Sequence, residues 1–331
     1  MILPEPFSIA FAPPHSGPQP LFRFRISLFL IAAHALQLVL LPLLVSPLSP
    51  PLHNSNGMAM KPPQPPAFVY GKDDALFGCI ERQQGSLPFG NVLDAGTGMH
   101  SLRWLATLDT LTSFTAITAD ATMKKNVELE AVNLGCLDRG TIVMGNWFGQ
   151  LTLPIEQYDT ILADYLIGAM DGFSPYKQEE MIAKLLHLLK PGGRLYIVGL
   201  EPIPDKVDGD ANVICKVRQV RDACILLAGH RCYREFPVEW ITHHIRQLSD
   251  IRPLETHLFP IVYKHSTIVR QINVGRSKFS LFPTPALASS MKEVLDALEL
   301  QSLEATKRSP TGTLKLGFDY VVSVEKVTTA T

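Results

Sequence analysis

An apolar strand that runs straight into an acid and a Gly-x-Gly turn constrains this chain more than any other feature. The run occupies residues 91–98 and reads Asn-Val-Leu-Asp-Ala-Gly-Thr-Gly. Gly96 and Gly98 would let the backbone approach a ligand more closely than any Cβ permits, and would adopt positive φ where needed. A helix that begins near Met99 would point its free N–H groups back at the ligand. The turn therefore predicts a nucleoside-type site at the edge of a parallel sheet.

Two residues beside the turn indicate which kind of cofactor fits. Asp94 stands two residues before the first glycine, and Ser101 stands where a dinucleotide fingerprint needs its third glycine. The phosphate cradle is thus incomplete, whereas the acid suits a cationic ligand with a free amino group. S-adenosylmethionine is such a ligand. Its methionine half would lie on Asp94, Ala95, Gly96, Thr97 and Gly98.

Strands and helices alternate after the turn. Apolar periodicity and turn residues predict strands at 115–120, 140–145, 158–165 and 194–200, with helices near 122–134 and 174–189. Ser174 as N-cap and Pro175 in the first turn would begin the second helix. This alternation predicts a doubly wound, mostly parallel α/β sheet.

Polar residues follow these strands at the edge where a cofactor would lie. Asp120, about one βαβ step beyond the turn and next to Ala121, would accept both ribose hydroxyls, although a dinucleotide enzyme places the same acid there. Asn146 could hydrogen-bond the adenine edge, and Trp147 or Phe148 could cover its face. A loop asparagine followed by two core aromatics is the other interpretation.

Together these residues resemble the class I S-adenosylmethionine-dependent methyltransferases over about residues 70–327. The motifs that carry the resemblance are Asp94–Gly98, Asp120, Gly145–Asn146, the strand at 158–165, the Leu-Leu-Lys-Pro-Gly-Gly-Arg-Leu run at 188–195 and the late strand at 318–324. Two residues depart from the family pattern: His100 replaces a small residue, and Asn146 replaces the usual acidic adenine contact.

The resemblance implies a Rossmann-like methyltransferase fold with a seven-stranded sheet and an antiparallel last strand. Strand six would lie at 252–263 and strand seven at 318–327. Roughly 50 residues, about 265–317, would form an insertion far longer than a hairpin needs. We expect this insertion to shape acceptor specificity.

The implied reaction is in-line transfer of a methyl group from a sulfonium to a small-molecule or lipid-like acceptor. Most of the catalysis would be alignment and exclusion of water. An acceptor that carries a proton also benefits from a base. The predicted catalytic residues are Asp164, Tyr165 and Tyr176, with Asp164 also near the cofactor. Partly buried structural tyrosines are equally consistent, and His230, His243 and His244 are alternative bases.

Composition and charge limit the remaining function classes. The formal net charge is −1, with 18% charged and 46% hydrophobic residues, which disfavours a nucleic-acid partner. The cluster Arg270, Arg276 and Lys278 is most simply a solvated surface, and contact with an anionic substrate or lipid head group is the other interpretation. Five cysteines without a C-x-x-C pair predict free thiols and no metal site. A nicotinamide-dependent oxidoreductase and a non-catalytic methyltransferase-like binding protein stay open.

A leader precedes the expected catalytic domain, which would span residues 67–331. Within residues 1–66, the segment 26–45 is nearly uninterrupted apolar sequence that follows two arginines, and a proline-rich linker ends the leader. Such a segment predicts a transmembrane anchor or a signal peptide. A start at Met58 or Met60, which would make the protein cytoplasmic, is the third interpretation.

Overall fold

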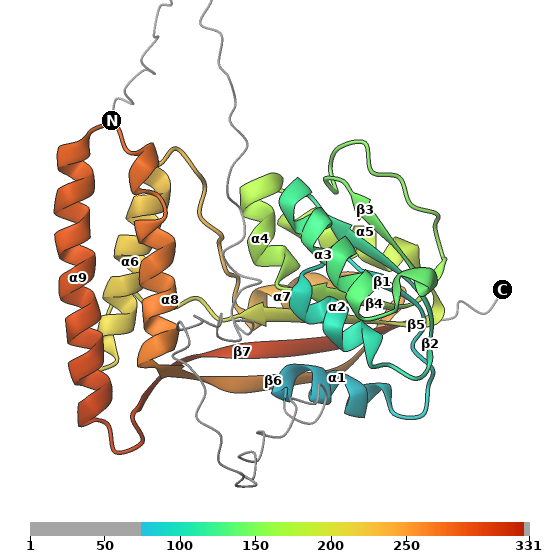
Figure 1. Cartoon of the computed structure of the whole chain (residues 1–331). Helices are drawn as coiled ribbons and strands as arrows, with labels where there is room; N and C mark the ends of the chain where they lie inside the picture. Colours follow the sequence, from blue (N-terminus) through green and yellow to red (C-terminus); the bar gives the residue numbers. More distant parts are fainter. Residues whose placement is uncertain (1–73, 328–331) are drawn as a thin grey trace, which may run out of the picture. The chain divides into compact units, whose positions relative to one another are not determined.

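A seven-stranded sheet in the order β3-β2-β1-β4-β5-β7-β6 organises residues 74–327, the part of the chain that the computed structural model describes (Figure 1). The strands are β1 Gly90–Asp94, β2 Leu111–Thr118, β3 Gly140–Met144, β4 Tyr158–Asp164, β5 Leu189–Leu200, β6 Ile251–Lys264 and β7 Thr313–Lys326. The helices are α1 Ala75–Gln84, α2 Met99–Ala106, α3 Ala121–Asn133, α4 Leu166–Phe173, α5 Gln178–Leu188, α6 Asn212–Leu227, α7 Val238–Arg246, α8 His265–Arg276 and α9 Pro285–Arg308, with short 3₁₀ turns at Leu137–Arg139 and Phe279–Leu281.

The pairing of the strands confirms the predicted fold class. Strands β1 to β5 pair in parallel with their neighbours, whereas β7 runs antiparallel to both β5 and β6. Strand β2 begins at Leu111, earlier than predicted, and β7 begins at Thr313 instead of residue 318. Both strands are extended at their outer ends, where the sequence is too polar to signal burial.

Helices cover both faces of the sheet and divide its core in two. One core joins α1, α2 and α3 to strand residues such as Val92 and Leu162. The other joins α4, α5 and α7 to Leu93 and Ile161, the strand residues next to Val92 and Leu162 in the sequence. Adjacent strand residues point to opposite faces, so each buried strand reads as a continuous apolar run.

Two local predictions are wrong around α4 and α5. Ser174 is the C-cap of α4, a helix that the sequence did not reveal, and α5 begins only at Gln178. The intervening Tyr176 has a φ of 65°, which interrupts the helical path. The Lys-Pro-Gly-Gly run at 190–193 does not precede a strand but forms an irregularity inside β5, between rungs at Leu189 and Arg194.

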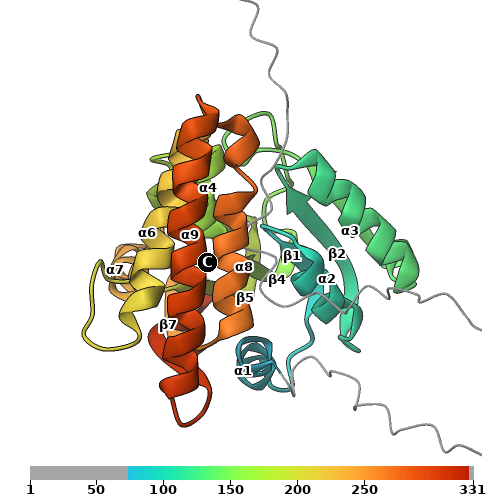
Figure 2. The same ribbon diagram turned by 60° about the vertical axis from the view of Figure 1, so that its left-hand side comes forward.

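A separate helical layer, the cap, consists of α6, α8 and α9. Figures 1 and 2 show these three helices side by side, and they share a third core with Tyr263 and Leu314 from the outer ends of β6 and β7. Helices α8 and α9 come from the predicted insertion, and α6 comes from the segment between β5 and β6.

The predicted leader at 1–66, with its apolar segment at 26–45, lies outside the described residues. Among the helices of residues 74–327, none combines the length and apolar content that a bilayer crossing requires.

Candidate functional site

The glycine turn after β1 is held from both neighbouring strands. The Ala95 amide donates to the Leu162 carbonyl of β4, and the Thr97 amide donates to the Ile117 carbonyl of β2, both at 2.8 Å. From the other side, the Trp147 indole donates to the Ala95 carbonyl at 2.7 Å. The turn is therefore preorganised, as a ligand cradle needs to be.

The two glycines of the turn act through space and not through unusual dihedrals. Neither has a positive φ among the described residues; Gly98 is extended, with φ −138° and ψ −176°. The expectation that they would use positive φ is wrong. A Cβ on Gly96 would lie 3.2 Å from Leu166 Cδ1, tighter than most real contacts. The first glycine thus lets β1 and α4 approach each other closely.

Asp94 is a buried acid with an unused oxygen. The Ser101 hydroxyl donates to its Oδ2 at 2.6 Å. Its Oδ1 and the buried Thr97 hydroxyl have no hydrogen bond of normal geometry within residues 74–327. Burial raises the pKa of Asp94 to about 6, against the opposing effects of Ser101, Thr97 and the Gly96 amide, which lie close to the carboxyl. One acceptor and one hydroxyl are therefore available at the turn, which fits a ligand that brings a cationic amino group.

Asp164, at the end of β4, is the second perturbed acid of this edge. Burial raises its pKa to about 7; His100 opposes that rise, and Asp94, Asp74 and Asp319 reinforce it. His100 Nε2 lies 2.9 Å from Asp74 Oδ2, at the N-terminus of α1. Asp94 of β1, Asp164 of β4 and Asp319 of β7 thus lie near one another at the C-terminal edge of the parallel strands.

The two predicted catalytic tyrosines lie in different surroundings. Tyr165 adopts a left-handed conformation, with φ 49°, and its hydroxyl donates to Asp319 Oδ1 at 2.8 Å. Burial raises its pKa well above the ordinary value, and Asp319 adds to the rise. Tyr176 is 81% exposed, and the Arg231 guanidinium lies 5.8 Å above its ring. The structure therefore brings Tyr165, but not Tyr176, into the acidic edge.

Asp120 lies two residues beyond β2, which ends at Thr118 and not at residue 120 as predicted, and it caps a helix. Its Oδ1 accepts from the Met123 amide at 2.6 Å as the N-cap of α3, whose first residue is Ala121. Burial raises the pKa of Tyr233, and the charge of Asp120 adds to that effect, so these two side chains face each other. The Asp120 carboxylate would therefore have to cap α3 and contact the ribose at the same time.

Asn146 and Trp147 are both engaged with protein groups. The Asn146 amide donates to the Phe173 carbonyl at 2.8 Å, and its Oδ1 accepts from Phe148 N and from the Ser174 hydroxyl. Trp147 packs in the core below the turn. These contacts fix the loop after β3 to the end of α4, and adenine contacts from either residue stay a prediction.

A cavity of about 590 Å³ lies between this edge and the cap. Leu200 and Ile203, which follow β5, form one part of its wall, and α6 forms another through Ile214 and Val217. The segment 231–235 lines it as well. Its size falls within the range of small-molecule sites.

The segment 231–235 joins the cavity to the strand ends. Arg234 N donates to the Gly168 carbonyl of α4 at 3.1 Å, and a Cβ on Gly172 would lie 3.2 Å from the Tyr233 ring. Sequence reasoning missed this segment, because nothing in its composition marks a site. It missed the Asp74 and His100 pair as well, although His100 already stood out in the glycine turn.

The basic cluster at 270–278 and the cysteines form ordinary structural contacts in the described residues. Arg276 pairs with Asp296 and Glu299 of α9. Lys278 is only 6% exposed, so its assignment to a solvated surface is wrong. The five cysteines are free thiols, and no cluster of metal-binding side chains occurs in the stretch 74–327.

Known proteins resemble this chain only distantly. No protein-family model matches the sequence, and no curated protein matches it. Among solved structures, a methyltransferase from Geobacter sulfurreducens bound to S-adenosyl-L-homocysteine is 15% identical, with a TM-score of 0.44, and covers 75% of this chain and 89% of its own. A methyltransferase from Thiobacillus denitrificans bound to the same molecule is 13% identical, with a TM-score of 0.43, and the match covers 75% of this chain and 90% of that protein. The YcgJ protein from Bacillus subtilis is 15% identical, with a TM-score of 0.48 over 76% of this chain and 98% of its own.

At such identities, function has to come from the residues of the chain itself. The seven strands and the antiparallel β7 confirm what the resemblance to the class I S-adenosylmethionine-dependent methyltransferases implies for the sheet. The chain therefore has a Rossmann-like, mostly parallel seven-stranded α/β fold.

Proposed function

We propose that this protein binds S-adenosylmethionine on the glycine turn and transfers its methyl group to a small-molecule or lipid-like acceptor. The observation that carries the proposal is the buried, unpartnered Oδ1 of Asp94 beside the unpartnered Thr97 hydroxyl, within the part of the chain that is described. An amino group of the cofactor would donate to both oxygens. A buried carboxylate is stabilised far more by a cation than by neutral donors.

The remaining parts of the cofactor have matching positions along the strand ends. Asp120 would hold the ribose at the end of β2, and the loop at Asn146 and Trp147 follows β3 at the same edge. Gly98 is extended and directly precedes α2, and without a Cβ it would let the ligand approach the backbone. When bound, the cofactor supplies an activated methyl group and a neutral leaving group.

We assign Asp164 the role of base for an acceptor that carries a proton. A pKa of about 7 leaves this carboxyl able to accept a proton near neutral pH. Tyr165 is less suited, because its raised pKa keeps the phenol protonated and its proton is donated to Asp319. Tyr165 would instead position Asp319 at the mouth of the site.

The acceptor would approach through the cavity between the strand ends and the cap. The Tyr233 side of this cavity adjoins Asp120, so an acceptor there lies near the end of the sheet that holds the cofactor. The apolar wall from Leu200, Ile203 and α6 would exclude water from the displacement.

A nicotinamide-dependent oxidoreductase is the weaker alternative. Ser101 is buried and bonded to Asp94, so the position of a third glycine is filled by a structural hydroxyl. The cation of an oxidised nicotinamide dinucleotide is a pyridinium ring, which has no N–H to donate to Asp94. Separate calorimetric titrations with S-adenosylmethionine, S-adenosylhomocysteine and NAD test the proposal.

We expect binding of the first two ligands and none of NAD. Binding of NAD alone would overturn the proposal. Binding of S-adenosylmethionine by a protein that methylates nothing in a broad acceptor panel would favour a non-catalytic binding protein.

A further inference from the structure

We infer that the cavity below the cap binds an acceptor with an apolar body and an anionic group, and that Arg218 and Arg221 of α6 hold the anion. The inference deepens the proposed function, on which it rests for the identity of the cavity as an acceptor site. Arg218, Arg221 and their neighbour Asp222 all line this cavity.

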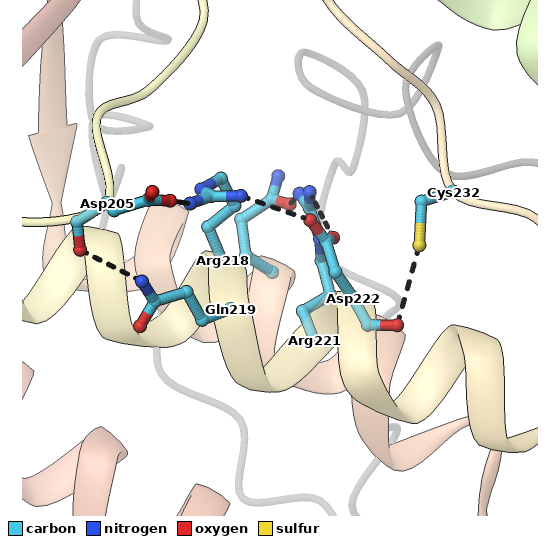
Figure 3. A network of polar contacts seen from close by, with 7 residues as sticks. Asp205, Arg218, Gln219, Arg221, Asp222 and Cys232 are labelled. Carbon is cyan, nitrogen blue, oxygen red and sulfur yellow. Dashed lines mark hydrogen bonds and ion pairs between the residues drawn. The ribbon is translucent and has the colours of Figure 1, made fainter. Parts of the chain in front are cut away.

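The three residues lie on one face of α6, because their spacing of three and four positions brings side chains together on a helix. Figure 3 shows Arg218, Arg221 and Asp222 on the same side of the helix, with Cys232 facing Asp222. Arg221 Nε and NH2 both donate to Asp222 Oδ1, at 2.9 and 2.7 Å. Arg218 NH1 lies 3.6 Å from Asp222 Oδ2.

Two guanidinium groups therefore share one partly buried carboxylate. The other acid in the network, Asp205, accepts from Arg218 at 2.7 Å, but its side chain is 90% exposed. Water screens that pair strongly, so it neutralises little of the charge inside the cavity. The cluster of Arg218, Arg221 and Asp222 consequently carries an excess positive charge on the cavity wall.

One donor of the cluster also lacks a partner. Arg218 Nε is buried and has no hydrogen bond within the described residues. Arg221 is held in place, because its NH1 donates to Gln271 Oε1 of α8 at 2.5 Å. The N–H groups of this fixed guanidinium that Asp222 and Gln271 do not use, together with the unsatisfied Arg218 Nε, are suited to a carboxylate or phosphate oxygen.

Part of the remaining wall suits an apolar body: Ile214, Val217 and Ile268 of the cap line the cavity with Leu200 and Ile203 of the sheet side. The other charged residues of the wall carry both signs, and Arg231 pairs with Asp171 at 3.1 Å. An anionic molecule with an aromatic or aliphatic body would place its charge on α6 and its body across the space toward Tyr233.

Fluorescence titration of the full chain with 1-naphthaleneacetate and with the neutral 1-naphthaleneacetamide tests this inference. We expect the anion to bind about tenfold more tightly than the amide, as one added hydrogen bond to a charged group predicts. Arg221→Gln should abolish this preference. The matched control is Arg246→Gln, an exposed arginine of α7 away from the cavity, which should keep it.

A variant that acts in the opposite direction guards against a simple loss of structure. Asp222→Asn keeps both arginines and removes their shared carboxylate, so the anion should bind more tightly than it binds the unaltered chain. Weaker anion binding by Asp222→Asn, equal binding of the two probes by the unaltered chain, or no binding of either would overturn the inference. Titration of each protein with S-adenosylmethionine is independent: its failure overturns the proposed function and leaves the anion preference as a property of the cavity.

Discussion

The glycine turn and the cap, for which we propose different ligands, are built in different ways. At the turn, Asp94 finds its partner Ser101 only seven residues away, and adjacent strands hold the backbone between them. In the cap, α6 packs on α8 and α9, which come from a later part of the chain beyond β6. A short motif thus specifies the turn, whereas the cap depends on contacts between distant segments. We therefore expect changes at the turn to affect the cofactor and changes in the cap to affect the acceptor.

The largest effect on cofactor affinity is expected from Gly98→Val. Gly98 has an extended backbone that valine also adopts, so the fold should survive. The added side chain would occupy the space of the ligand, and overpacking of this kind corresponds to a loss of about 100-fold in affinity. Calorimetric titration with S-adenosylmethionine gives the affinity, and thermal unfolding checks the fold. A folded variant of undiminished affinity would show that the ligand lies elsewhere.

The next effect concerns pH and Asp94. Burial raises its pKa to about 6, and a bound cation would lower that pKa, so binding near pH 6 releases a proton. The affinity should therefore be full well above pH 6 and fall about tenfold at pH 5, where a group of this pKa is mostly protonated. Asp164, with a pKa of about 7, adds to the loss. Calorimetric titration over this pH range measures the effect. Asp94→Asn should remove the loss of cofactor affinity that is centred near pH 6, and an unchanged pH dependence of affinity in this variant would contradict the role of Asp94.

Substitution of Asp120 separates its two roles. Asp120→Ala should weaken cofactor binding at least about tenfold, by the loss of charge-assisted hydrogen bonds to the ribose. It should also lower the free energy of unfolding by about 1 kcal/mol through loss of the α3 N-cap. Asp120→Asn keeps a capping side chain and loses only the charge. If calorimetry finds less than a twofold change in both variants, another residue holds the ribose.

The smallest effect on the cofactor is expected from the cap itself. Leu298 of α9 is buried in the core of the cap, and Leu298→Ala should lower its stability by about 2–5 kcal/mol. The affinity for S-adenosylmethionine should stay within about twofold, because cavity effects are local. Leu300→Ala, on the exposed side of the same helix, is the matched control. Equal losses of cofactor affinity and of stability in Leu298→Ala would show that the two regions are one unit.

The sequence predicted the turn and the sheet well because their signals are local. The strand ending at Asp94, the start of α2 at Met99 and the antiparallel β7 follow from short motifs and from the resemblance that they support. The extent of each strand was less predictable: the outer end of β7 has a polar surface, and only its pairing with β6 reveals it. Propensity cannot report pairing of that kind.

The cavity and its charges could not be read from the sequence. Tyr176 is 81% exposed and lies away from the acidic edge, yet it lines the cavity, which the sequence could not reveal. Ser174 looked like an N-cap, but its hydroxyl bonds to Asn146 and it ends α4. Arg218 and Arg221 look like ordinary surface arginines of an amphipathic helix. Only the packing of the cap over the strand ends encloses them.

The last rung of the long β6 and β7 ribbon pairs Lys264 with Thr313, the residues that flank α8 and α9. The chain thus leaves and re-enters the sheet at neighbouring points, about 5 Å apart in any β-ladder. For protein engineering, this makes the helices between them a cassette. Another helical pair with ends at that spacing, and with an apolar face for α6, could be spliced in without moving a strand. The same geometry would let these helices be exchanged while the edge of the sheet at the glycine turn stays as it is.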